Sequence, residues 1–194
     1  MPGAGLRVPI WILGSSLFGA QVAAALSLPF VFASHFAPAM LVDAIGIYRQ
    51  RFKPSALLPA PYVMLGVNVV AAATDGDARF LASSGRQSFA SLRSGHPIQL
   101  PPPSKEWERD QHDPADPLRR SRVSFIGAPD TVAAQMREFV ERTEADELIV
   151  VSHIYDHAAR LRSYEIAAAT MAGSSAHRGG DAALVQGPSP SARP

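Results

Sequence analysis

The sequence of 194 residues contains no cysteine. This absence excludes disulfide bonds, cysteine-ligated zinc or iron–sulfur sites and thiol nucleophiles, and it fits a cytoplasmic protein. An excess of charge of one sign is also lacking. The 18 Lys and Arg residues and 17 Asp and Glu residues give a formal net charge of +1, with no run of either sign. The sequence therefore gives no reason to expect nucleic acid as a partner.

Charged residues are absent between Arg7 and Asp43. An uncharged stretch of that length invites interpretation as a membrane span or a signal segment. However, Pro9 and Pro29 would interrupt a spanning helix, and several polar residues break the apolar run. Two buried parallel strands with a packed helix between them produce the same pattern. We therefore predict no membrane partner, and membrane association through residues 8–36 is the least favoured interpretation.

Apolar runs typical of buried strands alternate with segments of helical periodicity. This alternation predicts an α/β fold, in which helices cover a parallel sheet. Four such units curve into either half of a (β/α)8 barrel or an open sheet, and the pattern alone does not choose between them. The predicted strands are residues 8–13, 30–33, 62–70 and 147–152; the predicted helices are 17–26, 41–52, 74–93 with a weak point at 83–85, 129–142, and a last helix from 156.

Two segments lack this periodicity. Residues 95–122 contain six prolines together with charges, which indicates an irregular insertion loop. Order returns at residues 123–126, ahead of the fourth predicted strand. From residue 172 onward the residues are mostly small or polar, with many Pro and Gly, which is typical of a disordered tail. We therefore predict one domain over residues 1–171 and a disordered tail over 172–194.

The turn after the first predicted strand reads LGSSLFG and contains Gly14, Ser15, Ser16 and Gly19. Glycine lets the backbone approach an anion, serine hydroxyls donate hydrogen bonds, and a helix N-terminus presents free N–H groups. The same residues also suit a plain capped turn between a strand and a helix. From the residues alone both interpretations stay open.

Polar side chains also follow the second and fourth predicted strands, at the ends where α/β folds place their sites. His153 and His157 are four residues apart, but one ends a strand and the other begins a helix, so their rings should diverge and we predict no metal site. Asp156 is most simply a helix cap. The candidates for the wall of a pocket are His35 after the second strand, Asn68 within the third, and the cluster His153, Tyr155, Asp156 and His157.

Three segments in a fixed order resemble luciferase-like, flavin-dependent monooxygenases. They are residues 8–36 (VPIWILGSSLFGAQVAAALSLPFVFASHF), 62–72 (YVMLGVNVVAA) and 125–168, which begins FIGAPDTVAAQM. The resemblance extends from about Pro2 to Ala169 and is weakest over residues 95–123. It implies the C-terminal half of a TIM (β/α)8 barrel, about four βα units, in a family that uses reduced FMN and O2. Catalysis there comes mainly from the flavin, and no catalytic residue is assigned; His35 and His153 are candidates by position alone.

The resemblance also implies a cofactor site and partners. Gly14, Ser15, Ser16 and Gly19 fall on the turn that helps to hold the FMN phosphate in the family, and Ser34 falls on a loop near the flavin. The implied partners are a small-molecule substrate, O2 and a flavin reductase that supplies reduced FMN. Strands one to four of the family barrel have no counterpart, so we expect self-association or a missing N-terminal half. The alternative is a non-catalytic half-barrel remnant or dimerisation module.

Overall fold

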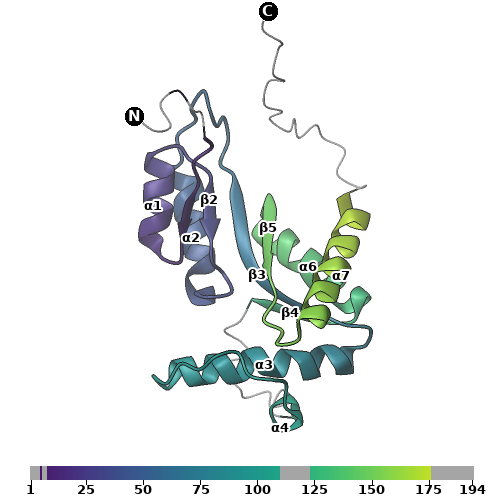
Figure 1. Ribbon diagram of the computed structural model, residues 1–194. Coiled ribbons are helices and arrows are strands. Elements are labelled where there is room, and N and C mark those ends of the chain that lie inside the picture. The colour runs from purple at the N-terminus through teal and green to yellow at the C-terminus, as the bar shows by residue number, and fades with distance from the viewer. Residues whose placement is uncertain (1–4, 6–7, 110–122, 176–194) are drawn as a thin grey trace, which may run out of the picture.

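The computed structural model describes residues 5, 8–109 and 123–175 and shows a parallel sheet with helices packed on one face (Figure 1). The described part of the chain holds five strands, whereas the sequence pattern predicted four. Every strand pair is parallel, as the strand–helix alternation predicted. The strands are β1 (Ile12–Gly14), β2 (Phe30–Phe32), β3 (Val63–Ala71), β4 (Ser124–Gly127) and β5 (Glu147–Val151).

The extra strand, β4, pairs with the C-terminal end of β3. Peptide groups of alternate residues along a strand point to opposite edges. Tyr62 and Gly66 accept hydrogen bonds from the segment of β2, and Asn68 donates to the carbonyl of Val123. All three are even-numbered, so β4 continues the edge occupied by β2. The odd-numbered Val63 accepts from the segment that leads into β5, which places β5 on the other edge.

Helices follow the strands as the alternation predicted. In Figure 1, α1 and α2 lie beside β2, α6 and α7 lie near β5, and α3 crosses below the C-terminal end of the sheet. The helix bounds are α1 (Leu17–Ala25), α2 (Leu41–Arg51) after a 3-10 turn at Pro38–Met40, α3 (Asp75–Arg93), α4 (Lys105–Arg109), α6 (Pro129–Thr143) and α7 (His157–Ser175).

Helix α3 is continuous, and the predicted weak point at residues 83–85 is wrong. Thr74 caps it, because its hydroxyl accepts from the Asp77 N–H at 3.1 Å and donates to the Asp77 carboxylate at 2.7 Å. Inside the helix, the Ser83 hydroxyl donates back to the Phe80 carbonyl at 2.6 Å. That bond satisfies the serine within the helix, so a residue that favours turns does not break it.

The proline-rich segment is partly ordered against α3. Gln87 donates to the Pro102 carbonyl at 3.1 Å, and the Ser83 hydroxyl accepts from the Ser104 N–H at 2.8 Å. The short helix α4 follows, and the rest of the predicted insertion, residues 110–122, lies outside the described residues. The predicted domain end at 171 falls inside α7, which continues to Ser175; the predicted tail beyond it also lies outside the described residues.

The core lies between the sheet and helices α1, α2, α6 and α7. Odd-numbered residues of β3 point into it and are fully buried from Val63 to Val69. Phe30 of β2 contacts Phe32 and Tyr48, and the Tyr48 hydroxyl donates to the Leu28 carbonyl at 2.9 Å. Desolvation by burial raises the pKa of Tyr48 above its usual value, so the phenol stays protonated and keeps donating at neutral pH.

The opposite face of the sheet exposes apolar side chains on its outer strands. Leu13 of β1 is 69% exposed and Ile149 of β5 is 50% exposed, whereas their strand neighbours Ile12 and Leu148 pack against the core. Among the described residues, β1 and β5 each pair with one strand only, so each leaves a free edge. No helix in the described part of the chain has the length and apolar character needed to span a bilayer.

Candidate functional site

The turn after β1 brings two glycines into contact. A Cβ atom built on Gly19 would lie 3.3 Å from the Gly14 Cα and 3.7 Å from the ring of Phe30. These glycines therefore let α1 pack directly on β1, which is a structural reason for them that holds with or without a ligand. The close approach also fixes the direction in which the N-terminus of α1 points.

Two serines in this turn leave donors available. Ser16 occupies the N-cap position of α1 with extended backbone angles, and its hydroxyl makes no capping hydrogen bond. Ser15 is partly exposed and Ser16 is exposed. The N–H groups of the first helical turn and two hydroxyls thus lie at the C-terminal end of β1, an arrangement that fits a phosphate group.

Ser34 lies in a different environment from the other predicted cofactor residues. It is fully buried, and its hydroxyl donates to the Gly66 carbonyl at 2.7 Å. The His35 N–H donates to the same carbonyl at 3.0 Å. The loop after β2 is therefore attached to the middle of β3, and the Ser34 hydroxyl is engaged within the protein.

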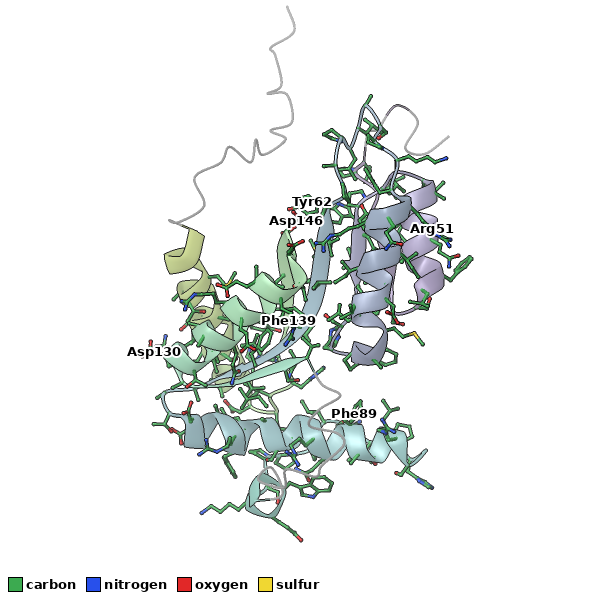
Figure 2. The ribbon with its side chains drawn as sticks, turned by 180° about the vertical axis from the view of Figure 1, so that it is seen from behind. Arg51, Tyr62, Phe89, Asp130, Phe139 and Asp146 are labelled. Atoms are coloured by element: carbon green, nitrogen blue, oxygen red, sulfur yellow. The ribbon has the colours of Figure 1, made fainter. Side chains whose placement is uncertain are left out.

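A cavity of about 670 Å³ lies at the C-terminal ends of β3 and β4, beneath α3; we refer to it as the α3 cavity. Helix α3 contributes residues at spacings of three and four, which places them on one helical face. Figure 2 shows Phe89 projecting from α3 on the side toward the sheet. Asp75, Arg79, Ala82, Arg86 and Phe89 line the cavity from that face.

Sequence reasoning missed this helix as a wall of the site. The sequence signal that could have revealed it is the spacing of three and four between these apolar and charged residues. A helix broken at residues 83–85 would not keep them on one face. Three residues that sequence reasoning selected meet this wall, because His35, Asn68 and His153 line the α3 cavity together with Trp107 of α4. The structure therefore brings together one residue of β3 and two residues from the loops after β2 and β5.

The imidazole rings of His35 and His153 lie with their centroids 6.4 Å apart and their planes tilted by 52°. Asn68 organises their surroundings, because its side-chain oxygen accepts from the backbone N–H of His153 at 3.1 Å and its side-chain amide donates to the Ser124 hydroxyl at 3.2 Å. A Cβ on Gly85 would lie 3.0 Å from the His153 Cβ. The glycine therefore lets α3 pack against His153.

The other three residues of the cluster after β5 lie outside the lining of the α3 cavity. Asp156 caps α7 by accepting from the Ala159 N–H at 2.7 Å, as the sequence predicted. His157 contacts Arg160 at 2.8 Å on the exposed start of that helix, away from the residues that line the α3 cavity. Tyr155 is 53% exposed. No group of three metal-ligating side chains occurs within the described ranges.

Asp75 fastens α3 to the turn after β4. Its carboxylate accepts from the Ala128 N–H at 2.7 Å, and that hydrogen bond, followed by one from Thr131 and the charge of Arg79, lowers the pKa of Asp75. Gly127 leaves space for this contact, because a Cβ there would lie 2.7 Å from the Asp75 Oδ1 atom. One carboxylate thus joins two walls of the α3 cavity.

We expect Asp75→Asn to lower stability at neutral pH but not in acid. A carboxylate whose pKa is lowered on folding contributes stability above its unfolded pKa of about 3.9, and this stability is lost as pH falls through the folded value. Urea unfolding of both proteins at pH 7, 5 and 3.5 should therefore show a difference that shrinks below about pH 4. Asp43→Asn, which removes an exposed carboxylate on α2, is the control. A difference independent of pH would contradict the assignment.

Comparison with known proteins identifies the family. The model of the luciferase-like monooxygenase family matches residues 1–147. This chain belongs to that family. A luciferase-like monooxygenase of Escherichia coli K12 is 44% identical over 172 residues, which cover 86% of this chain and 50% of the relative.

Solved structures of luciferase-like proteins extend the comparison. Apo-MsnO8 shares 32% identity with this chain at a TM-score of 0.74, covering 88% of this chain and 56% of that one. The FMN complex of the oxygenating constituent of 3,6-diketocamphane monooxygenase from Pseudomonas putida shares the fold at a TM-score of 0.57 and 21% identity. The chain spans about half the length of the relatives that it matches. Its parallel sheet corresponds to about half of a luciferase-like TIM barrel.

Proposed function

We propose that this chain is the C-terminal half of an FMN-dependent, O2-using monooxygenase. The observation that carries the proposal is the family match combined with the half-length coverage. Reduced flavin, delivered by a flavin reductase, would supply two electrons, so that one atom of O2 enters the substrate and the other leaves as water. The protein's part is to bind the flavin, orient the substrate and exclude water.

The turn after β1 is the proposed phosphate site. The N–H groups at the start of α1 and the hydroxyls of Ser15 and Ser16 supply donors, while Gly14 and Gly19 hold helix and strand in contact. The α3 cavity is the proposed site for the substrate and the reactive part of the flavin. Ser34 keeps a supporting role in this proposal, because its buried hydroxyl fixes the loop that carries His35.

The exposed apolar residues on the sheet indicate where an N-terminal half-barrel would bind. Leu13 and Ile149 would lie inside a closed barrel, and the free edges of β1 and β5 are where further parallel strands would pair. A four-stranded N-terminal half of the luciferase-like type fits this surface. The same surface also favours a second candidate function, in which two copies of the chain pair as a dimerisation module.

Reductase-supported oxidation tests the proposed function. The chain is mixed with the N-terminal half of the E. coli relative, together with FMN, NAD(P)H, a flavin reductase and O2. We expect substrate oxidation by the mixture that exceeds the sum of the separate halves. Equal activity of the mixture and the reductase alone, measured across aldehyde, alkane and sulfonate substrates, would contradict the proposal and favour the dimerisation module.

We expect Ser16→Asp to weaken FMN binding by the mixed halves about tenfold. A carboxylate at the N-cap would still suit the helix, but it would repel a bound phosphate by about 1–2 kcal/mol. Fluorescence titration with FMN measures the effect. Gln50→Glu changes the net charge by the same amount at an exposed site on α2 and is the matched control. Equal FMN affinity of the two variants would contradict the proposal that the FMN phosphate binds at this turn.

A further inference from the structure

We propose that His35 donates a hydrogen bond from its outward ring nitrogen to a carbonyl oxygen of the ligand in the α3 cavity. The inference rests on the proposed function, because it assigns a ligand-contacting residue within the same site. It goes further by naming the donor atom and the chemical group that this atom recognises.

Gly66 allows the imidazole of His35 to lie against strand β3. A Cβ built on Gly66 would be 3.0 Å from the His35 Nδ1 atom and 3.1 Å from its Cε1 atom. Any larger residue at position 66 would therefore push the ring away from the strand. One edge of the imidazole packs against backbone, and the opposite edge is left for the cavity that His35 lines.

The two ring nitrogens of His35 differ in their surroundings. Nδ1 is buried and has no hydrogen-bond partner among the residues that the structure describes. As the ring is placed, Nδ1 and Cε1 form the edge nearest to Gly66, and Nε2 is not among the atoms nearest to that position.

This asymmetry selects the tautomer of the neutral ring. Neutral imidazole carries a proton on one nitrogen and a lone pair on the other. A proton on the nitrogen facing Gly66 would need space against the strand backbone, whereas a lone pair needs less, and among the described residues this nitrogen has no hydrogen-bond partner in either tautomer. The lone pair therefore faces Gly66, and the N–H, on Nε2 as the ring is placed, points away from the strand.

The other walls of the α3 cavity define the rest of the ligand. The cavity lining includes the apolar side chains of Phe36, Phe89, Leu92, Leu100 and Trp107. The same lining carries the charged side chains of Asp75, Arg79 and Arg86, so the cavity fits a ligand with an apolar part and several hydrogen-bonding atoms. A neutral N–H donor matches an uncharged carbonyl oxygen. Such a carbonyl can come from an organic substrate or from the flavin ring, and the experiment separates these two sources.

Three substitutions of His35 separate the position of the donor from the size of the side chain. The amide nitrogen of Gln reaches the position of Nε2, that of Asn reaches the position of Nδ1, and Phe keeps a ring without a donor. We expect His35→Gln to bind carbonyl ligands nearly as the parent does, whereas His35→Asn and His35→Phe lose about threefold to tenfold in affinity, the range expected for one hydrogen bond. His157→Gln is the matched control, because His157 is exposed outside the cavity lining.

Ring ¹⁵N NMR of the full chain tests the proposal directly, with His35 assigned by comparison with His35→Gln. The spectrum should show the proton on Nε2. Acetophenone should shift that nitrogen, and α-methylstyrene, which replaces the carbonyl with an isosteric CH2, should not. A shift with riboflavin alone would assign the carbonyl to the flavin, and a shift with acetophenone would assign it to the substrate.

Several results would overturn the proposal: a proton on Nδ1, equal shifts with acetophenone and α-methylstyrene, equal affinities in His35→Phe and the parent, or no response to millimolar acetophenone and riboflavin. The acetophenone arm requires no flavin. If FMN failed to bind to the completed barrel while acetophenone still shifted the His35 signal, the proposed monooxygenase function would fail and the His35 assignment would stand.

Discussion

Replacing Phe30 with alanine lowers the free energy of unfolding by about 3–5 kcal/mol, the range for truncating a fully buried phenylalanine. The Phe30 ring is completely buried and lies 5.3 Å from the Tyr48 ring, centroid to centroid. It also lies beside Gly14 and Gly19, so its loss leaves a cavity beneath the turn after β1. A large part of the stability of a domain of this size depends on this one side chain.

Urea unfolding followed by circular dichroism measures this change. Phe18→Ala is the matched control, because Phe18 lies on α1 close to the same turn but is 72% exposed. We expect the control to change stability by less than about 0.5 kcal/mol. Similar losses in the two variants would mean that the core does not lie beneath β2.

We expect the double substitution Leu13→Lys and Ile149→Lys to weaken the association of the chain with an N-terminal half-barrel. In the chain alone Leu13 is 69% exposed and Ile149 is 50% exposed, so the substitutions cost little before association. In the closed barrel each lysine would be buried without a partner, at a cost of several kcal/mol. We therefore expect association to weaken at least about 100-fold, which corresponds to about 3 kcal/mol.

Analytical ultracentrifugation of the mixed halves measures this association. Leu57→Lys is the control, because Leu57 is 91% exposed in the loop between α2 and β3 and adds the same type of charge. Unchanged association of the double variant would show that the exposed face of the sheet is not the surface that joins the halves. Association of the chain with itself, lost in the same variant, would instead support pairing of two copies.

The sequence predicted the parallel sheet correctly, because strands buried between helices and a barrel interior are continuous apolar runs. It predicted β1 too long, over residues 8–13. The strand begins only at Ile12, and the exposed Val8 and Ile10 precede it without a strand partner. An apolar run shows that a segment can form a strand, but hydrogen bonding to a neighbour decides where the strand begins.

Strand β4 was missed for a related reason. Its four residues give too short a pattern to distinguish a strand from a loop, and its pairing with β3 depends on contacts between positions more than fifty residues apart. The candidate site shows the same limit. Strand ends predicted the place of His35 and His153 in a cavity lining, whereas the burial of Ser34 and the wall formed by α3 depend on how the loops fold back.

Flavin binding by the separate and the mixed halves tests the central claim most directly. The chain, the N-terminal half of the E. coli relative and their equimolar mixture are each incubated with FMN, desalted and measured by absorbance. The account predicts stoichiometric FMN in the mixture, and weak or no retention by the chain alone. A tight, stoichiometric FMN complex of the chain alone, or no FMN retained by a mixture that has formed a stable complex, would contradict it.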